Sequence, residues 1–194
     1  MVDVAGYYEL TTPGDVITSG QLTLAEVKSF LRVEHGDDDT LITSLIYGVT
    51  NTFERFTNRF FTAQSWTVSF PRTEAGAFVE IQRGWLASIV EVRLYDVDTN
   101  TFVATTDFYQ KKRNGFHHIV FEDFIPQPTN KPFAIEIDFT CGISAIPADL
   151  KNALKAHINY LYENRGDTES VGALAWPLES DLIYGNYRII PTYV

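Results

Sequence analysis

The chain is poor in the features that mark secreted miniproteins and membrane proteins. Its 194 residues include a single cysteine, Cys141, which excludes an intramolecular disulfide framework. No run of 18 apolar residues occurs, so we expect no membrane-spanning helix. The first residues lack a basic segment followed by an apolar stretch, and a signal peptide is therefore not expected. Because a chain of this length can bury its own core, we predict one domain over residues 1–194.

Basic residues are also scarce. Fifteen Lys and Arg against 25 Asp and Glu give a net charge of −10, and residues 1–50 alone carry eight acids and two bases. An acidic chain repels phosphate, which disfavours tight reading of nucleic acid but suits a surface that DNA passes without adhering. Solubility alone would also explain this charge.

Motifs for catalysis or metal binding are missing. Cys141 follows a predicted strand without any nucleophile motif around it, and a lone cysteine is typically a small buried hydrophobe. His117 and His118 are neighbours on a predicted strand, where they would point to opposite faces and could not share an ion. Residues 96–107 have part of a calcium-loop spacing, but Thr101 stands where the glycine is needed. We therefore expect no enzyme, no cofactor and no metal.

The first strong structural signal is a helix start at Thr23. Thr23 and Glu26 have the spacing of a capping box, in which each satisfies a backbone N–H of the other. The apolar spacing that follows predicts a helix over about 24–33, ended by Gly36.

A second, longer helix is predicted after the acidic stretch Asp37–Asp39. Carboxylates at a helix N-terminus accept unpaired N–H groups and oppose the positive end of the dipole. Apolar residues then recur every three or four positions, which indicates one stripe about five turns long. Gly48 lies inside this segment and suggests close packing against another helix. The stripe comprises Leu41, Leu45, Val49, Phe53, Phe56 and Phe60, and Ile42 and Ile46 widen it.

From Gln64 the apolar period changes to two, which is typical of strands. We predict about six antiparallel strands over 64–140, with a hairpin turn at Asp98–Asn100. Asn114–Gly115 has the composition of a type I′ turn and joins two further strands.

A third helix is predicted from Pro147 to Gly166, since proline suits a first helical position. The predicted fold class is α+β: a small helical bundle, with two N-terminal helices and one C-terminal helix, an inserted antiparallel β unit and extended arms. The segments are an arm at 1–21 with one short strand, helices at 22–62, the β unit at 63–146, the helix at 147–166 and a tail at 167–194. The predicted helical core consists of Leu24, Val27, Leu31, Leu41, Leu45, Val49, Phe53, Leu154, Ile158 and Leu161.

The order of these elements, together with several short motifs, resembles the head–tail connector (adaptor) proteins of tailed bacteriophages and gene-transfer particles. The resemblance extends over about residues 7–190. The motifs are Leu22–Lys28 with Phe30–Val33, Asp37–Asp39 before Leu41, Thr57–Phe61 leading to Gln64–Trp66, Ile146–Lys151, Tyr162–Arg165 and Tyr187–Arg188.

The resemblance implies a structural protein of the virion neck, assembled in the host bacterial cytoplasm. Such proteins form a homo-oligomeric ring below the portal protein, with about twelve copies set by the portal. The ring extends the channel through which DNA passes and offers a docking face to the tail or to tail-completion (stopper) proteins. Asp37, Asp38 and Asp39 are then candidates for the channel lumen or its rim.

The C-terminal tail is the candidate contact segment. Residues 180–194 are apolar and aromatic but show no helical or strand period, so they need a surface to cover them. We interpret the tail as docking on the portal or on a neighbouring subunit, with Tyr184 and Tyr187 as aromatic anchors. The alternative is that it folds back on its own domain. The candidate contact residues are Leu182, Ile183, Tyr184, Tyr187, Arg188 and Ile189.

Other readings stay open at this point. The chain could be a different virion component, such as a tail-completion protein. The aromatic content of 14% would also suit a carbohydrate-binding β module, although the helices argue against it. A small hydrolase that uses Cys141 or a histidine is the remaining alternative.

Overall fold

The computed structural model describes residues 6–12, 22–71, 78–113, 116–122, 133–143, 145–165 and 177–190. The chain forms two compact units from interleaved segments. The strand unit takes its described residues from 1–14, 62–142 and 190–194, and the helical unit from 15–61 and 143–189. This combination of helices and antiparallel sheets confirms the predicted α+β class.

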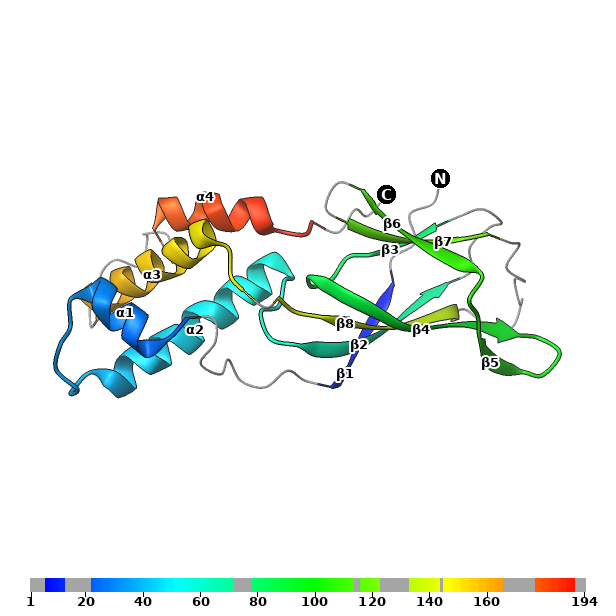
Figure 1. Cartoon of the computed structure of the whole chain (residues 1–194), viewed down its shortest axis with the longest axis horizontal. Coiled ribbons are helices and arrows are strands. Elements are labelled where there is room, and N and C mark those ends of the chain that lie inside the picture. Colours follow the sequence, from blue (N-terminus) through cyan, green and yellow to red (C-terminus); the bar gives the residue numbers. More distant parts are fainter. Residues whose placement is uncertain are drawn as a thin grey trace. The chain divides into compact units, whose positions relative to one another are not determined.

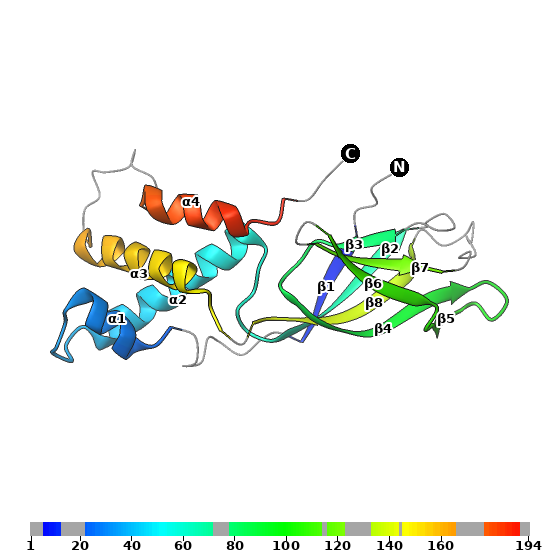
Figure 2. The same cartoon turned by 45° about the horizontal axis from the view of Figure 1, so that its top comes forward.

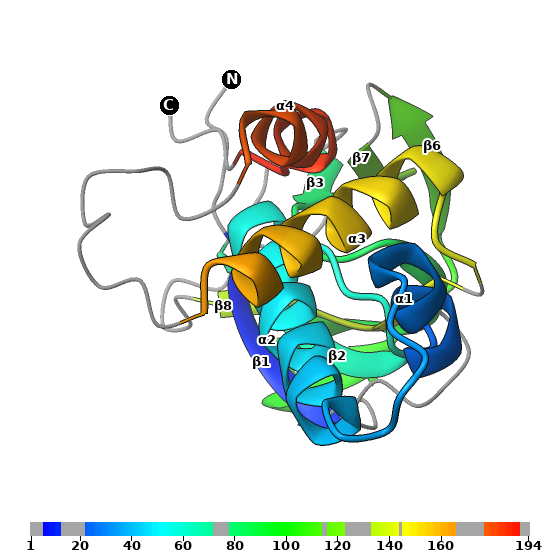
Figure 3. The same cartoon turned by 90° about the vertical axis from the view of Figure 1, so that its left-hand side faces the viewer.

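The helical unit contains four helices in its described residues (Figure 1). They are α1 (Leu24–Leu31), α2 (Asp39–Thr57), α3 (Ala148–Glu163) and α4 (Leu178–Tyr187). Helices α2 and α3 each contact all three of the others, as the view in Figure 3 shows. Three of the helices were predicted, whereas α4 lies in the tail that we predicted to be irregular. That prediction was wrong.

Helix α1 begins as predicted. The hydroxyl of Thr23 accepts from the backbone N–H of Glu26 at 3.2 Å, and the Glu26 carboxylate accepts from the backbone N–H of Thr23 at 3.0 Å. The predicted end at Gly36 was wrong. Arg32 takes the left-handed conformation with φ 56°, and its N–H bonds back to the last turn, so the helix closes at Leu31.

The predicted apolar segment of α2 contains two neighbouring stripes at its start, and the helix buries the one with Ile42 and Ile46. Ile42 and Ile46 are buried, whereas Leu41 is exposed and Leu45 is half-buried. Both stripes have the same spacing, so the sequence period alone does not decide between them, and contact with α3 and α4 does. The helix also ends at Thr57, followed by Asn58 with φ 56°, which leaves Phe60 outside it.

The remaining core predictions hold in part. Val27, Val49, Phe53, Leu154 and Ile158 are buried, as expected for the helical core. Leu24, Leu31 and Leu161 are only half-buried. The expected close packing at Gly48 was wrong, because nothing lies within 4 Å of the position of an added Cβ.

The strand unit contains two antiparallel sheets (Figure 1). The five-stranded sheet has the order β1-β2-β8-β4-β5, and the three-stranded sheet the order β3-β7-β6. The strands are β1 (Tyr7–Thr12), β2 (Gln64–Pro71), β3 (Phe78–Ile81), β4 (Leu86–Asp96), β5 (Thr101–Ala104), β6 (Phe108–Arg113), β7 (Phe116–Phe121) and β8 (Phe133–Cys141). Strand β1 confirms the short strand expected in the N-terminal arm. Seven strands cover 64–141 where about six were expected, the additional one being the short β5.

The predicted hairpin turn between β4 and β5 is present. Asn100 adopts φ 57°, and the Asp96 carboxylate accepts from the backbone N–H of Asp98 at 2.9 Å, which closes the turn without an ion. The predicted turn at Asn114–Gly115 lies outside the described residues. The strands that it joins, β6 and β7, are paired antiparallel.

Alternation along the strands builds the core of this unit. The three-stranded sheet lies over one face of the five-stranded sheet (Figure 2). Each sheet buries its apolar face, and the five-stranded sheet is left with a polar outer face, as is usual for antiparallel sheets. The buried residues include Trp66, Val68, Phe70, Ile135, Ile137 and Phe139 from the larger sheet, and Val79, Ile81, Ile119 and Phe121 from the smaller.

Candidate interaction surfaces

The C-terminal helix α4 is fastened to its own unit by polar bonds at both ends. Near its start, the buried hydroxyl of Ser180 donates to the carbonyl of Ala153 in α3 at 2.9 Å. After its end, the backbone N–H of Ile189 donates to the carbonyl of Thr57 in α2 at 2.9 Å. Two buried bonds to two different helices fix the position of α4 within the bundle.

The side chain of Tyr184 completes this attachment. It is fully buried and packs edge to face against Phe53, with ring centroids 5.1 Å apart. Its hydroxyl lies 3.2 Å from Nδ1 of the buried His157, within hydrogen-bond distance. Burial raises the pKa of Tyr184, so the phenol stays neutral. Tyr184 is thus a core residue of the helical unit.

Tyr187 and Arg188 lie at the rim of the same contact. The Tyr187 hydroxyl donates to the carboxylate of Asp149 at 3.0 Å, and the Tyr187 carbonyl accepts from Nε of Arg59. The guanidinium of Arg188 lies 4.8 Å above the ring of Phe56. Both side chains remain partly or fully accessible, although they are already engaged within the unit.

These positions correct the predicted use of the tail. Tyr184 and Ile189 are buried in their own unit and are not available as surface anchors in this structure. The described part of the tail, residues 177–189, packs on the helical unit, in line with the alternative interpretation that the tail folds back on its own domain. Sequence analysis missed the helix because its apolar residues lie on two faces, so that no single-sided period appears.

The second apolar face of α4 is the accessible one. Leu178 and Leu182, four residues apart, are 61% and 65% exposed, and Gly185 follows on the same side of the helix. Ile183 is half-buried between the two faces. Of the predicted apolar and aromatic contact residues, Leu182 is therefore the exposed one, and Leu178 is its unpredicted neighbour.

The three aspartates at the start of α2 have separate roles. Asp39 forms an ion pair with Lys28 of α1 at 2.5 Å, and Asp38 accepts from the hydroxyl of Tyr162 in α3. The Tyr162 hydroxyl, and next the Arg165 guanidinium, hold the pKa of Asp38 below its usual value. Asp38 occupies the N-cap position without a side-chain cap bond, so the predicted capping by its carboxylate was wrong. Only Asp37 has an open carboxylate: its side chain is 96% exposed, with His35 at 3.9 Å.

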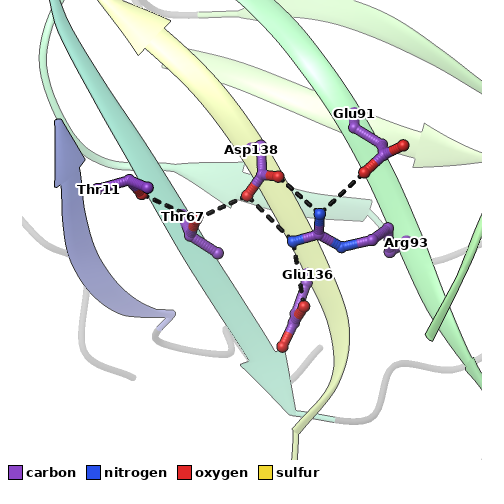
Figure 4. A network of polar contacts seen from close by, with 6 residues as sticks. All are labelled: Thr11, Thr67, Glu91, Arg93, Glu136 and Asp138. Atoms are coloured by element: carbon purple, nitrogen blue, oxygen red, sulfur yellow. Dashed lines mark hydrogen bonds and ion pairs between the residues drawn. The ribbon is translucent and has the colours of Figure 1, made fainter. Parts of the chain in front are cut away.

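The outer face of the five-stranded sheet is a polar surface that sequence reasoning missed. In Figure 4 the guanidinium of Arg93 lies among three carboxylates, those of Glu91 at 2.8 Å, Asp138 at 2.7 Å and Glu136 at 3.2 Å. The hydroxyl of Thr67 donates to Asp138 at 2.6 Å. The alternation of Ser, Thr, Asp and Glu along 64–71 and 133–141 was the sequence signal for this surface.

The candidate catalytic and metal-binding residues Cys141, His117 and His118 lie on strands β7 and β8. Cys141 is fully buried at the end of β8. In the register of β7, His117 faces Lys112 and Ile81, whereas His118 faces Lys111 and Glu80, so the two histidines lie on opposite faces as predicted. Within the described ranges no group of three or more His, Cys, Asp or Glu could hold a metal. No helix in the same ranges is long and apolar enough to cross a membrane.

Several solved structures similar to this chain come from gene transfer agent (GTA) particles. A chain in the neck of an empty GTA particle, computed with C6 symmetry, matches with a TM-score of 0.69 and 20% identity over 96% of this chain and 97% of that one. A chain in the virion of a native GTA particle matches with a TM-score of 0.69 and 20% identity, covering 95% and 96%. The neck of a native particle, computed with C12 symmetry, gives 0.66 and 20%, covering 95% and 97%.

Comparison with family models gives a direct assignment, although no curated protein matches significantly. The model of the head completion protein family matches residues 21–173, which include three of the four helices and seven of the eight strands. This match confirms the resemblance to connector proteins that the motifs indicated. The chain belongs to the head completion protein family.

Proposed function

We propose that the chain is a structural protein of the neck of a tailed phage or gene-transfer particle, where copies form a ring below the portal. The observation that carries this proposal is the fold match to GTA neck chains, which extends over nearly the whole length of both chains. The family assignment supports it independently. A C12 neck among the matched structures agrees with about twelve copies, the number expected from the portal.

In this proposal the outer face of α4 contacts the portal or a neighbouring subunit. Leu178 and Leu182 present adjacent apolar side chains on a helix whose opposite face is fixed by Tyr184. A rigid helix with an apolar outer face loses little conformational entropy on binding, which favours a stable contact. The surfaces that contact neither the portal nor a neighbouring subunit would then bind the tail or a stopper protein.

Asp37 is the acidic residue we assign to the lumen or its rim. Its carboxylate is exposed, whereas Asp38 and Asp39 bind α3 and α1. Replacing Asp37 by Asn removes one charge per copy without removing a bond between helices. We expect rings of this variant to retain more DNA at low salt and no more than wild type at high salt.

Particle assembly without the chain tests the proposal. A producer strain that lacks the gene should make DNA-filled or leaking heads without tails, and the purified wild-type chain should restore tail joining. A Leu178→Asp/Leu182→Asp variant should fold with an unchanged Tm but fail to join heads, whereas Glu179→Gln on the same helix should join normally. Tailed particles from the deletion strain would refute the neck role. Normal joining by the double variant would refute only the α4 contact.

A further inference from the structure

The basic segment of β6 lacks a counter-charge in the described part of the chain. Strand β6 is an edge strand of the three-stranded sheet and pairs only with β7 there. Lys111 and Lys112 are both exposed, and neither forms an ion pair with a described residue. Glu80 lies in the same row as Lys111, two strands away, but its carboxylate accepts from Nε2 of His118 at 3.0 Å.

The outer face of the five-stranded sheet has the opposite charge. The strand registers place Glu9, Thr67, Asp138 and Glu91 in one row across β1, β2, β8 and β4. The next row contains Glu136 and Arg93. Four carboxylates and one guanidinium leave this face with a net −3, even with Arg93 fully paired. Glu9, Glu91, Glu136 and Asp138, together with Arg93, are called the acidic face below.

One copy cannot join these two surfaces to each other. The two sheets pack face to face, so their outer faces point away from one another. Lys111 lies on the outer side of the smaller sheet, in register with His118, and the acidic face lies on the outer side of the larger sheet. Lys112, in register with His117 and Ile81, lies on the opposite side of β6. A second copy, placed head to tail, could bring Lys111 against the acidic face, and such contacts close into rings when the rotation allows.

We propose that, in the assembled ring, Lys111 of one copy binds the acidic face of the next copy. The inference rests on the proposed ring and specifies one of its subunit contacts. Copies with a net charge of −10 repel one another, and a local meeting of opposite charges would offset part of this repulsion. Such complementarity sets the register and the rate of docking more than its affinity.

A different role for the lysines must be separated by experiment. Lysines on an edge strand discourage sheet-to-sheet aggregation and need no partner for that. Two charge-reversal variants distinguish the roles: Lys111→Glu on β6, and Glu9→Lys/Glu91→Lys on the acidic face. If reversal at Glu91 lowers the Tm through its contact with Arg93, Glu9→Lys alone takes its place.

Each variant alone should lose at least tenfold in ring formation, measured by sedimentation of the concentrated full-length chain and by binding to portal-bearing heads. An equimolar mixture of the two should restore rings, because each reversed surface then meets an opposite charge. The restored rings should dissociate at high salt sooner than complexes held by apolar contacts. Wild-type assembly by both single variants, or no rescue by the mixture although both variants are folded, would overturn the proposal.

Cross-linking provides a second readout that needs no variant. A zero-length carbodiimide reagent joins a lysine amine to a carboxylate that contacts it. With a mixture of light and heavy isotope-labelled copies, we expect cross-links from Lys111 to Glu9, Glu91 or Glu136 between a light and a heavy chain. Their absence in both the concentrated chain and assembled heads would overturn the contact. The proposed neck role, as distinct from this subunit contact, would be refuted if the wild-type chain did not join heads at all.

Discussion

The ring of Tyr184 in α4 packs edge to face against the ring of Phe53 in α2, with centroids 5.1 Å apart. Phe53 in turn stacks on Phe61 at 4.9 Å, so the three aromatic rings form one continuous buried cluster. This relationship makes the C-terminal helix part of the core of the helical unit. A contact surface on α4 is therefore carried by a fixed helix.

The Tyr184 contact predicts a large loss of stability on truncation. Tyr184→Ala should lower the free energy of unfolding by about 3–5 kcal/mol, since it removes a buried ring and leaves a cavity. Tyr184→Phe keeps the ring, loses the bond to His157 and should cost about 1 kcal/mol. Urea unfolding followed by helical circular dichroism would measure both.

The control for this series lies on the opposite face of the same helix. Leu182→Ala changes an exposed side chain and should shift the unfolding free energy by no more than about 0.5 kcal/mol. Equal losses for Tyr184→Ala and Leu182→Ala would show that α4 does not pack as described.

A second prediction tests which stripe of α2 is buried. Ile42 is fully buried, whereas its neighbour Leu41 is 36% exposed. Ile42→Ala should cost about 2–5 kcal/mol through lost burial and a residual cavity, and Leu41→Ala well under half as much. If urea unfolding instead showed the larger loss for Leu41→Ala, Leu41 rather than Ile42 would face the core.

The outcome for α2 shows what the sequence can and cannot determine. The capping box at Thr23, the strand alternation and the α+β order were readable because each depends on local spacing. The choice between Leu41/Leu45 and Ile42/Ile46 depends on which side faces α3 and α4, which is a tertiary property. Two apolar stripes with the same period can be told apart only by the helices that pack against them in the folded chain.

The candidate surfaces were less predictable for the same reason. Helix α4 has leucines on one face and Tyr184 on the other, so its sequence shows no one-sided period. The acidic face depends on the register of four strands, which brings Glu9 and Asp138 into one row across more than 100 residues of sequence. Asp38 and Asp39 were candidates for helix capping and for the channel lumen, and their contacts with Tyr162 and Lys28 could not be foreseen from local spacing.

Gly48 allows a stabilising substitution. It lies in the middle of α2 on an exposed side, and an added Cβ would meet nothing within 4 Å. Gly48→Ala should therefore raise the unfolding free energy of the free chain by about 0.5–1 kcal/mol, because alanine restricts the unfolded backbone and favours the helix. A lower Tm for this variant would show that the site is closely packed after all.

Glu26 predicts a specific pH dependence of stability. Its carboxylate accepts from the Lys151 ammonium at 2.6 Å and from the backbone N–H of Thr23 at 3.0 Å, and these bonds lower its pKa to about 2. The folded state thus binds the proton more weakly than the unfolded chain, whose glutamate titrates near pH 4.3. The contribution is complete above about pH 4.3 and is lost as the pH falls towards 2. Glu26→Gln cannot titrate, so the Tm difference between wild type and this variant should shrink across that window. A constant difference from pH 6 down to pH 2 would mean that the Lys151 bond does not stabilise the ionised carboxylate in solution.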